Sequence, residues 1–343
     1  MNRQDLLNTP VEHIDITAFD PAPLIEAYGK MAFQARNLAA ACRIYERMIA
    51  DKDCAIILCL AGSLFSAGLK TVVRDLVRYK MVDAVVSTGA IIVDQDFFEA
   101  LGFRHYRGTP FIDDELLREN MIDRIYDTFI DEEELRVCDH TVGTIADSLP
   151  PRPYSSREFI RELGRYLERE GKGEDSLTLE CHRKAVPVFV PAFSDCSAGF
   201  GLIAHQHRRG KEAAVTIDSA RDFLELTRIK IAAGETGLVM IGGGVPKNFA
   251  QDIVVAADIL EENPSMHRYA IQITVADERD GALSGSTLKE AHSWGKVDDV
   301  YEQMVFAEAT IALPLLAGYV YHRADWRKRE PKAYADIFEE ENR

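Results

Sequence analysis

The sequence predicts an α/β protein with a doubly wound, mostly parallel sheet, and two observations support this fold class. Short, mostly apolar runs, among them Cys54–Leu60, Val82–Ser87 and Gly237–Ile241, are typical of strands that are buried on both faces. Each run is followed by a turn of small residues and then by a stretch of helical periodicity. Strands that alternate with helices favour parallel pairing, so we expect a Rossmann-like sheet with helices on both faces.

The elements can be assigned in order along the chain. Apolar residues recur at helical spacing from Leu24 to Ile49, which predicts a helical N-terminal region over residues 1–50. Residues 51–325 form the predicted Rossmann-like domain, with further strands expected at 186–190, 213–217 and 269–274 and helices at 64–79, 94–101, 219–232 and from Pro246 onward. Residues 104–184 are highly charged and proline-containing, which indicates a helical insertion in this domain. We expect residues 326–343 to form a charged, solvated tail.

Charge and composition argue against several function classes. The 40 Lys and Arg residues against 56 Asp and Glu residues give a formal net charge of −16, which is a poor basis for binding the phosphates of nucleic acids. An acidic surface attracts cationic small molecules, although it also simply keeps a protein soluble. No apolar stretch approaches the ~18 residues of a membrane span. We therefore expect neither nucleic acid nor membrane as a partner.

The six cysteines form no C-x-x-C pair and have no His/Cys ligand spacing, so no metal site is predicted. Several of them lie in apolar runs, where a free thiol behaves as a small hydrophobic group. The N-terminus also lacks the apolar segment of a secretory signal. These features fit a reducing, cytoplasmic setting.

Ligand-binding residues are expected in the loops after the strands, because open α/β sheets bind ligands at the carboxyl ends of their strands. Gly242–Gly244 would let the backbone approach a ligand closely, and the amides of the next helix favour an anion such as a dinucleotide pyrophosphate. The same glycines would also suit a plain tight turn. Asp218, at the end of a predicted strand, could bind a ribose hydroxyl or cap the next helix, and its position alone favours the cap.

Lys296 is a candidate nucleophile. It follows Trp294 and Gly295 in a long loop, and a lysine that is desolvated there could form a Schiff base. A single lysine is more often a surface charge, so spacing alone favours the surface interpretation.

Five segments spread over most of the chain carry a resemblance to a known family: Glu26–Asn37, Leu117–Ile125, Val186–Asp195, Ile241–Lys247, and the block with Asp280–Gly285 and Glu290–Lys296. These segments resemble the deoxyhypusine synthase family, which includes homospermidine synthases. The resemblance implies an NAD-dependent transferase in which an active-site lysine carries an aminobutyl group from spermidine to an acceptor amine. It places that lysine at Lys296.

The resemblance also assigns the other site residues. It implies that NAD is bound by residues in or beside the strand-end loops, namely Gly62, Ser63, Thr88, Gly89, Asp195, Asp218, Gly243, Gly244, Thr274, Asp280, Glu308 and Ala309. It places Glu290 and Trp294 in the amine pocket, where a carboxylate holds an ammonium group and an indole packs on methylene groups. It further implies a homotetramer with active sites at a dimer interface.

The chain departs from the family pattern in its polyamine anchors. Asn248 stands where deoxyhypusine synthases have a histidine, so a general base is missing there. Asp252, one helical turn later, would offer a carboxylate on the same helix face, and we assign both residues to the substrate site. Phe200 and Leu283 replace acidic residues that anchor the polyamine.

A further departure lies in the loop after Thr88, which is one residue longer than in the family. It brings Asp94, Gln95 and Asp96 to positions where the family has acidic residues. The sequence alone leaves open whether these side chains face a substrate or solvent.

Three functions are compatible with these residues. The altered anchors favour an aminobutyltransferase that acts on a polyamine or diamine and a small amine acceptor, with a homospermidine-like product. The second is deoxyhypusine synthase proper, whose acceptor is a lysine of initiation factor 5A. The third is a non-catalytic relative that binds NAD or polyamine, and the presence of Glu290, Trp294 and Lys296 argues against it.

Overall fold

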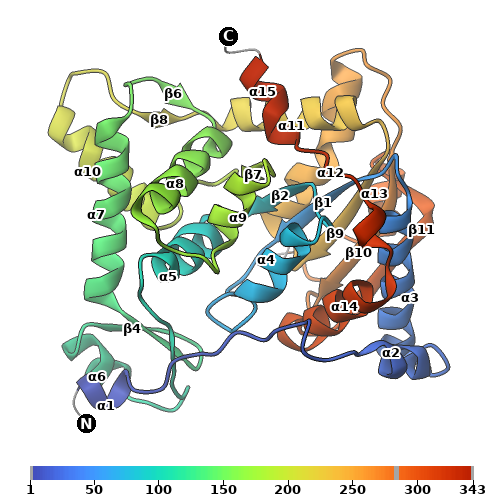
Figure 1. Cartoon of the computed structure of the whole chain (residues 1–343), viewed down its shortest axis with the longest axis horizontal. Coiled ribbons are helices and arrows are strands. Elements are labelled where there is room, and N and C mark those ends of the chain that lie inside the picture. Colours follow the sequence, from blue (N-terminus) through green and yellow to red (C-terminus); the bar gives the residue numbers. More distant parts are fainter. Residues whose placement is uncertain (1–2, 282–285, 341–343) are drawn as a thin grey trace.

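A central parallel sheet organises the structure, a computed structural model that describes residues 3–281 and 286–340. Its strands are β1 (Ala55–Leu60), β2 (Ala84–Ser87), β7 (Val188–Phe189), β9 (Thr236–Ile241), β10 (His267–Thr274) and β11 (Val297–Phe306). Their order across the sheet is β11-β10-β9-β1-β2-β7, and every neighbouring pair is parallel (Figure 1). The predicted doubly wound fold is confirmed, and the strand order reverses direction between β1 and β9.

Side chains of the central strands alternate between two apolar clusters, one on each face of the sheet. In β1, Ile56 and Leu58 belong to one cluster, whereas Ile57 and Cys59 belong to the other. All residues of β1 are buried, so this strand is continuously apolar in sequence. The first cluster includes side chains of α2 (Ala22–Tyr28), α3 (Phe33–Ala50), α4 (Lys70–Arg78) and α14 (Ala309–Arg323); the second includes those of α11 (Ser219–Ala233), α12 (Gly244–Ile259) and α13 (Leu288–Ser293).

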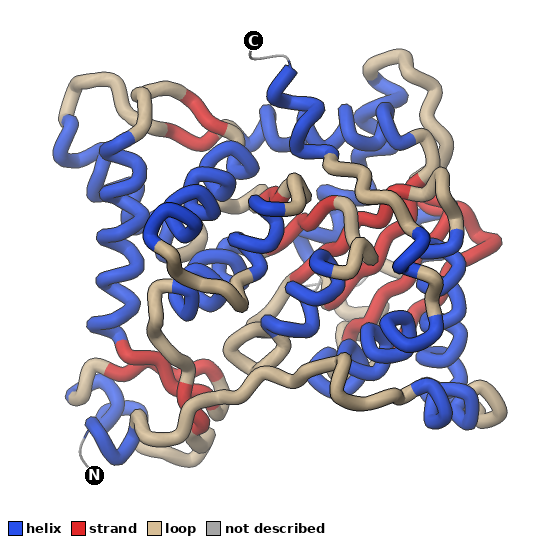
Figure 2. The backbone as a smooth tube through the Cα atoms, in the orientation of Figure 1, coloured by secondary structure: helices blue, strands red, loops and turns tan. Residues whose placement is uncertain are grey.

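The predicted insertion at 104–184 contains strands as well as helices. Its helices are α6 (Asp114–Glu119), α7 (Glu132–Ser148), α8 (Ser156–Glu170) and α9 (Leu177–Arg183). In addition, β3 (Tyr106–Arg107), β4 (Ile122–Ile125) and β5 (Thr128–Asp131) form a three-stranded antiparallel sheet near α1 (Arg3–Leu6), seen in red at the lower left of Figure 2. These strands were not predicted, because sequences such as Ile-Asp-Arg-Ile are too short and charged to show a strand period.

The strand expected at 213–217 is wrong as a member of the central sheet. β8 covers only Thr216–Ile217 and pairs with β6 (Pro153–Tyr154) in a separate two-stranded sheet. Asp218 follows it and caps α11, because its carboxylate accepts hydrogen bonds from the N–H groups of Ala220 and Arg221, both at 3.1 Å. The cap interpretation of Asp218 therefore holds, since no strand of the central sheet carries this residue toward the strand-end loops.

The C-terminal segment also differs from the solvated tail that was expected. It contains short helical turns at Trp326–Lys328 and Tyr334–Asp336 and the helix α15 (Ile337–Glu340). Arg329 is buried and forms an ion pair with Asp83 at 2.5 Å. Tyr334 and Phe338 join the second apolar cluster. Charge alone was misleading here, because a buried ion pair cannot be distinguished from surface charge in a sequence.

The segment after β2 is π-helical over Ala90–Phe97 and continues into one turn of α-helix, α5 (Phe98–Ala100), where an ordinary helix at 94–101 was expected. A π-helical turn holds one residue more than an α-helical turn. This geometry would be a physical means of accommodating one extra residue, which is what the family resemblance implies for the loop after Thr88.

Two acidic side chains of the π-helix bind the starts of other helices. Asp94 accepts the N–H of Ser197 at 2.7 Å, at the first residue of α10 (Ser197–Arg209). Asp96 accepts the N–H groups of Leu177 and Thr178 at 2.8 and 2.7 Å, at the start of α9. Both carboxylates therefore serve as helix caps supplied from a distant part of the chain.

Candidate functional site

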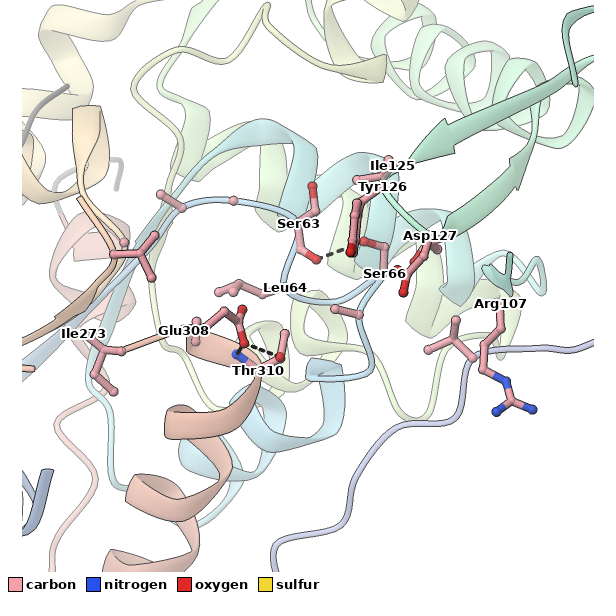
Figure 3. A pocket seen from close by; sticks show the side chains of 18 of the residues that line it. Ser63, Leu64, Ser66, Arg107, Ile125, Tyr126, Asp127, Ile273, Glu308 and Thr310 are labelled. Carbon is pink, nitrogen blue, oxygen red and sulfur yellow. Dashed lines mark hydrogen bonds between the residues drawn. The ribbon is translucent and has the colours of Figure 1, made fainter. Parts of the chain in front are cut away.

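A cavity of about 1250 Å³ opens at the carboxyl ends of the central strands, beside the point where the strand order reverses (Figure 3). Its inner side is formed by the loop after β1, Gly242 after β9, the end of β10 and the start of α14. Open α/β sheets bind their ligands at this position. The volume exceeds the roughly 300–1,000 Å³ of ordinary small-molecule pockets, so a dinucleotide would fit.

Glycines give the inner side of the cavity an open backbone. Gly62 has φ +94° and Gly242 has φ +80°, a conformation that side-chain-bearing residues rarely adopt. A Cβ atom at Gly62 would have no protein atom within 4 Å and would extend into open space. The neighbouring loop is held by Gln95 of the π-helix, whose Oε1 accepts the N–H groups of Phe65 and Ser66 at 2.9 and 3.0 Å.

The outer side of the cavity, which we call the outer wall, consists of Thr9, Val11, Glu12, Arg107, Gly108 and Ile125–Thr128. The N-terminal segment extends the small antiparallel sheet here. The N–H of Val11 donates to the carbonyl of His105, and the N–H of Arg107 donates to the carbonyl of Thr9, both at 2.8 Å. Sequence reasoning missed the outer wall, because only tertiary contacts bring these segments to the strand ends.

Only part of the predicted NAD set lies at this cavity. Gly62, Ser63, Thr274, Glu308 and Ala309 line it. Gly243 and Gly244 follow directly after the lining residue Gly242 and begin α12. The carboxylate of Glu308 caps α14 by accepting the N–H of Thr310 at 2.9 Å, and it borders the cavity where it could also accept ribose hydroxyls (Figure 3).

The remaining predicted cofactor residues lie elsewhere in the chain. Thr88 and Gly89 follow β2, and Asp195 is an exposed residue just before α10. None of these three residues lines the cavity. Gly89 is needed for close packing, since an added Cβ would lie 2.5 Å from the Sγ atom of Cys196. Asp218 borders a different hollow of about 400 Å³. Asp280 is exposed in the loop after β10.

Lys296 lies in a second cluster on the α12 side of the sheet. Its Nζ atom is 2.5 Å from Oδ1 of Asp252, and its side chain is only 17% exposed. The same Nζ atom lies 5.1 Å from the ring centroid of Trp294, which gives a cation–π contact although the indole itself is largely exposed. Spacing favoured a surface lysine, and the structure instead shows one that is mostly shielded and has two specific partners.

Other residues predicted for the amine pocket surround this cluster. Asn248 lies one helical turn before Asp252 on α12. Glu290 caps α13 in a capping box with Thr287, and hydrogen bonds from Thr287 lower the pKa of this carboxyl. Lys247, which was not predicted, donates to the carbonyl and Oγ of Ser286 at 2.7 and 2.8 Å, and burial lowers its pKa. Leu283 lies outside the described residues.

The two clusters lie at opposite ends of β11. Lys296 immediately precedes this strand and Glu308 follows it closely. The ten residues of β11 span roughly 30 Å at about 3.3 Å per residue, so the backbones of Lys296 and Glu308 are far apart. Within one chain, the shielded lysine therefore does not border the large cavity.

The described residues contain no group of three or more His, Cys, Asp and Glu side chains that could hold a metal ion. Among the helices of residues 3–281 and 286–340, none is long and apolar enough to cross a membrane. The six cysteines are all buried and free.

A family model described as deoxyhypusine synthase matches residues 23–320 of this chain. The chain belongs to the deoxyhypusine synthase family. It is 61% identical to the deoxyhypusine synthase-like protein of Chlorobaculum tepidum, over 97% of this chain and 95% of that protein. The corresponding protein of Coxiella burnetii (strain RSA 493) is 59% identical, over 99% of this chain and 97% of its own length.

More distant members of the deoxyhypusine synthase family are also similar. Probable deoxyhypusine synthase 2 of Methanosarcina mazei is 40% identical, over 98% of this chain and 96% of that protein. The crystal structure of a putative deoxyhypusine synthase from Entamoeba histolytica superposes with a TM-score of 0.62 at 18% identity, covering 94% of this chain and 99% of that one. This last likeness shows a shared fold, and membership of the deoxyhypusine synthase family implies a transferase.

Proposed function

We propose that this protein is an NAD-dependent aminobutyltransferase that uses Lys296 as its nucleophile. The donor is a polyamine such as spermidine, and the acceptor is a small amine, so the product is homospermidine-like. The observation that carries this proposal is the shielded Lys296 amine, held between the Asp252 carboxylate and the Trp294 ring. A sequestered amine with an adjacent carboxylate that can accept its proton fits lysine-imine chemistry.

The chemistry of Lys296 follows from its contacts. The amine must be neutral to attack, and Asp252 is close enough to accept its proton. The carbon under attack is that of the imine formed when the donor's secondary amine loses a hydride and a proton. A bond forms between this carbon and Nζ, and the bond to the departing diamine breaks as that diamine takes up a proton. The acceptor amine then forms its own bond to the same carbon, and the bond from this carbon to Nζ of Lys296 breaks. The resulting imine takes back the hydride and a proton, which gives the secondary amine of the product.

The large cavity is the proposed cofactor site. Gly62, Ser63 and Gly242 would allow close approach of a pyrophosphate, and Glu308 would accept ribose hydroxyl groups. Bound NAD would supply a reversible hydride acceptor, so the overall reaction needs no outside oxidant. Arg107 is the only basic residue among the described ones that line the cavity, against the acidic Glu12, Asp127 and Glu308. We therefore expect NADP, with its additional phosphate, to bind more weakly than NAD.

The choice of a small acceptor rests on the altered anchors. Phe200, at the start of α10, is 62% exposed and presents an aromatic ring where the family has an acidic polyamine anchor. Asn248 lies on the same helix as Asp252 and has no titratable group to act as a base. A binding site with fewer carboxylates favours a shorter amine with fewer charges.

A second subunit is part of this proposal. Lys296 and the cavity of one chain lie at opposite ends of β11, so a partner subunit would bring a cavity to each lysine. We infer an active site at a dimer interface within a homotetramer, in the cytoplasm. Light scattering at micromolar concentration tests this inference, and a monomer would contradict it.

The deciding experiment is mass spectrometry after borohydride trapping. The protein is incubated with NAD and, separately, with spermidine, putrescine or agmatine, and the Lys296→Arg variant is treated in parallel. Lys247→Arg is the matched control, since this lysine is also buried and lies nearby. We expect an aminobutyl adduct on the wild type and on Lys247→Arg but not on Lys296→Arg.

The acceptor is identified in the same system. Without borohydride, transfer of the aminobutyl group from spermidine to putrescine supports the proposed function, whereas transfer only to a lysine of initiation factor 5A would support deoxyhypusine synthase proper. A protein that binds NAD but forms no adduct with any of the three amines would be a non-catalytic relative.

A further inference from the structure

Tyr126 occupies a position in the outer wall where the backbone favours glycine. It is the first of two residues that join β4 to β5, because Ile125 pairs with Thr128 across the hairpin. Its φ is +53°, and two-residue hairpin turns with a positive φ at the first position favour glycine there. A tyrosine in this conformation carries strain, and strained residues of this kind gather at functional sites.

The turn is firmly held despite this strain. Nη1 of Arg124 donates to the carbonyl of Tyr126 at 2.8 Å, and the same guanidinium forms a two-bond contact with Asp114 at 2.7 and 2.8 Å. The N–H of Gly108 donates to the carbonyl of Asp127 at 2.7 Å. These contacts hold the backbone of the turn, so they fix the point from which the Tyr126 side chain extends, which is what a binding residue requires.

The ring of Tyr126 faces the cavity. Figure 3 shows it extending from the hairpin turn toward the loop of Ser63 and Leu64, which lies on the inner side. Tyr126 remains 71% exposed, so its apolar ring is in contact with water in this structure. A planar ligand group placed against it would remove that ring surface from water.

We propose that Tyr126 stacks on one of the two bases of the dinucleotide cofactor and closes the outer side of its site. This inference rests on the proposed function for the identity of the ligand. Every nucleobase presents a flat π face, and stacking on an aromatic side chain is a general way to hold one. The strained turn is then explained, because glycine would suit the backbone but would leave the base without a stacking partner.

The test uses the substitution that the backbone favours. Tyr126→Gly removes the ring and relieves the positive φ, so it should leave the thermal unfolding midpoint unchanged or higher. Its dissociation constant for NAD, measured by calorimetry, should rise about tenfold or more. Tyr126→Phe keeps the ring and should bind NAD within about twofold of the wild type.

Phe33→Gly is the matched control. Phe33 is also an exposed aromatic residue with positive φ, at +54°, but it does not line the cavity. This variant should bind NAD as the wild type does. If Tyr126→Gly bound NAD with wild-type affinity, this inference would be overturned while the proposed function stood.

ADP-ribose identifies the base in contact. If NAD and ADP-ribose both bind Tyr126→Gly more weakly, the ring stacks on adenine; if only NAD does, it stacks on the nicotinamide. Both outcomes support the proposal. If the wild-type protein did not bind NAD, the proposed function would be contradicted, and this inference would fail with it.

Discussion

The Nζ atom of Lys296 lies 2.5 Å from a carboxylate oxygen of Asp252, which links the residue preceding β11 to the middle of α12. Asp252 therefore holds the amine in position, and its carboxylate is also a nearby acceptor for the proton of the amine. This pair connects a loop that carries a reactive group to a helix that begins at the cofactor cavity.

Asp252→Asn should slow the formation of the lysine adduct by about a hundredfold, the lower range for loss of a general base. The amide keeps the size of the side chain and cannot take a proton, so the fold should be retained. Single-turnover trapping at neutral pH measures the rate. The control is Asp258→Asn on the same helix, which is exposed, and equal rates for the two variants would contradict a role for Asp252.

Gly62→Ala should weaken NAD binding about tenfold, because the new methyl group enters the open cavity and the backbone keeps a strained φ. Gly102→Ala is a matched control, since Gly102 has φ +112° and equally open surroundings but does not line the cavity. Both variants should lose about 1 kcal/mol of unfolding free energy. Calorimetry with NAD should separate them, and similar affinities would place the ligand elsewhere.

Glu99→Gln should destabilise the protein by about 3 kcal/mol at pH 7, because it removes a carboxylate that is shared by three buried cations or hydrogen-bond donors. Nζ of Lys70 and the rings of His13 and His105 each lie 2.7 Å from Glu99. Burial alone would raise the pKa of Glu99, but hydrogen bonds from both histidines and the charge of Lys70 outweigh it and hold the pKa well below its usual range.

The pH dependence of this cluster follows from that direction. A carboxyl whose pKa is lowered by folding stabilises the native state above its unfolded pKa of about 4.3, and this contribution is lost as the pH falls further. Urea unfolding at pH 7 and at about pH 3 measures it. Glu115→Gln, which removes an exposed partner of Arg118, should have no measurable effect, and a similarly small effect of Glu99→Gln would refute this prediction.

His267 should make the protein sensitive to acid at a higher pH. It is fully buried, its Nδ1 lies 2.7 Å from the Thr236 hydroxyl, and burial lowers its pKa to about 3. The unfolded chain takes up a proton near pH 6.5, which the folded chain does not, so stability falls as the pH decreases from there toward 3. The contribution lost at pH 5 is about 2 kcal/mol.

His267→Gln should show a shallower loss of unfolding free energy between pH 7 and pH 5 than the wild type does. The backbone N–H of His267 donates to the backbone carbonyl of Lys296 at 2.9 Å, and this hydrogen bond is kept in the variant. Parallel pH profiles for the two proteins would mean that another group causes the acid sensitivity.

Local sequence signals were sufficient for five strands of the central sheet, but β11 was not predicted, because its charged and polar residues hide the strand pattern. Gly62 and Thr274 follow or end an apolar strand, and the ends of parallel strands meet at one edge. Glu308, which follows β11, was assigned only through the family resemblance. Asp218 was harder to place, because its strand is real but too short, and it pairs outside the central sheet.

Tertiary contacts account for what the sequence did not reveal. Tyr126 reaches the cavity through an unpredicted hairpin, and Arg329 is buried because Asp83 neutralises it. The ion pair between Lys296 and Asp252 was not predicted. The helical spacing places Asp252 and Asn248 on one helix face, but it gives no information about a lysine on another segment.

The π-helical segment after β2 limits how this chain can evolve. Three consecutive side chains, Asp94, Gln95 and Asp96, each hold a different part of the fold: the start of α10, the loop that lines the cavity, and the start of α9. Deleting one residue would turn the following side chains by about 100° around the helix axis and would break several of these attachments in a single step.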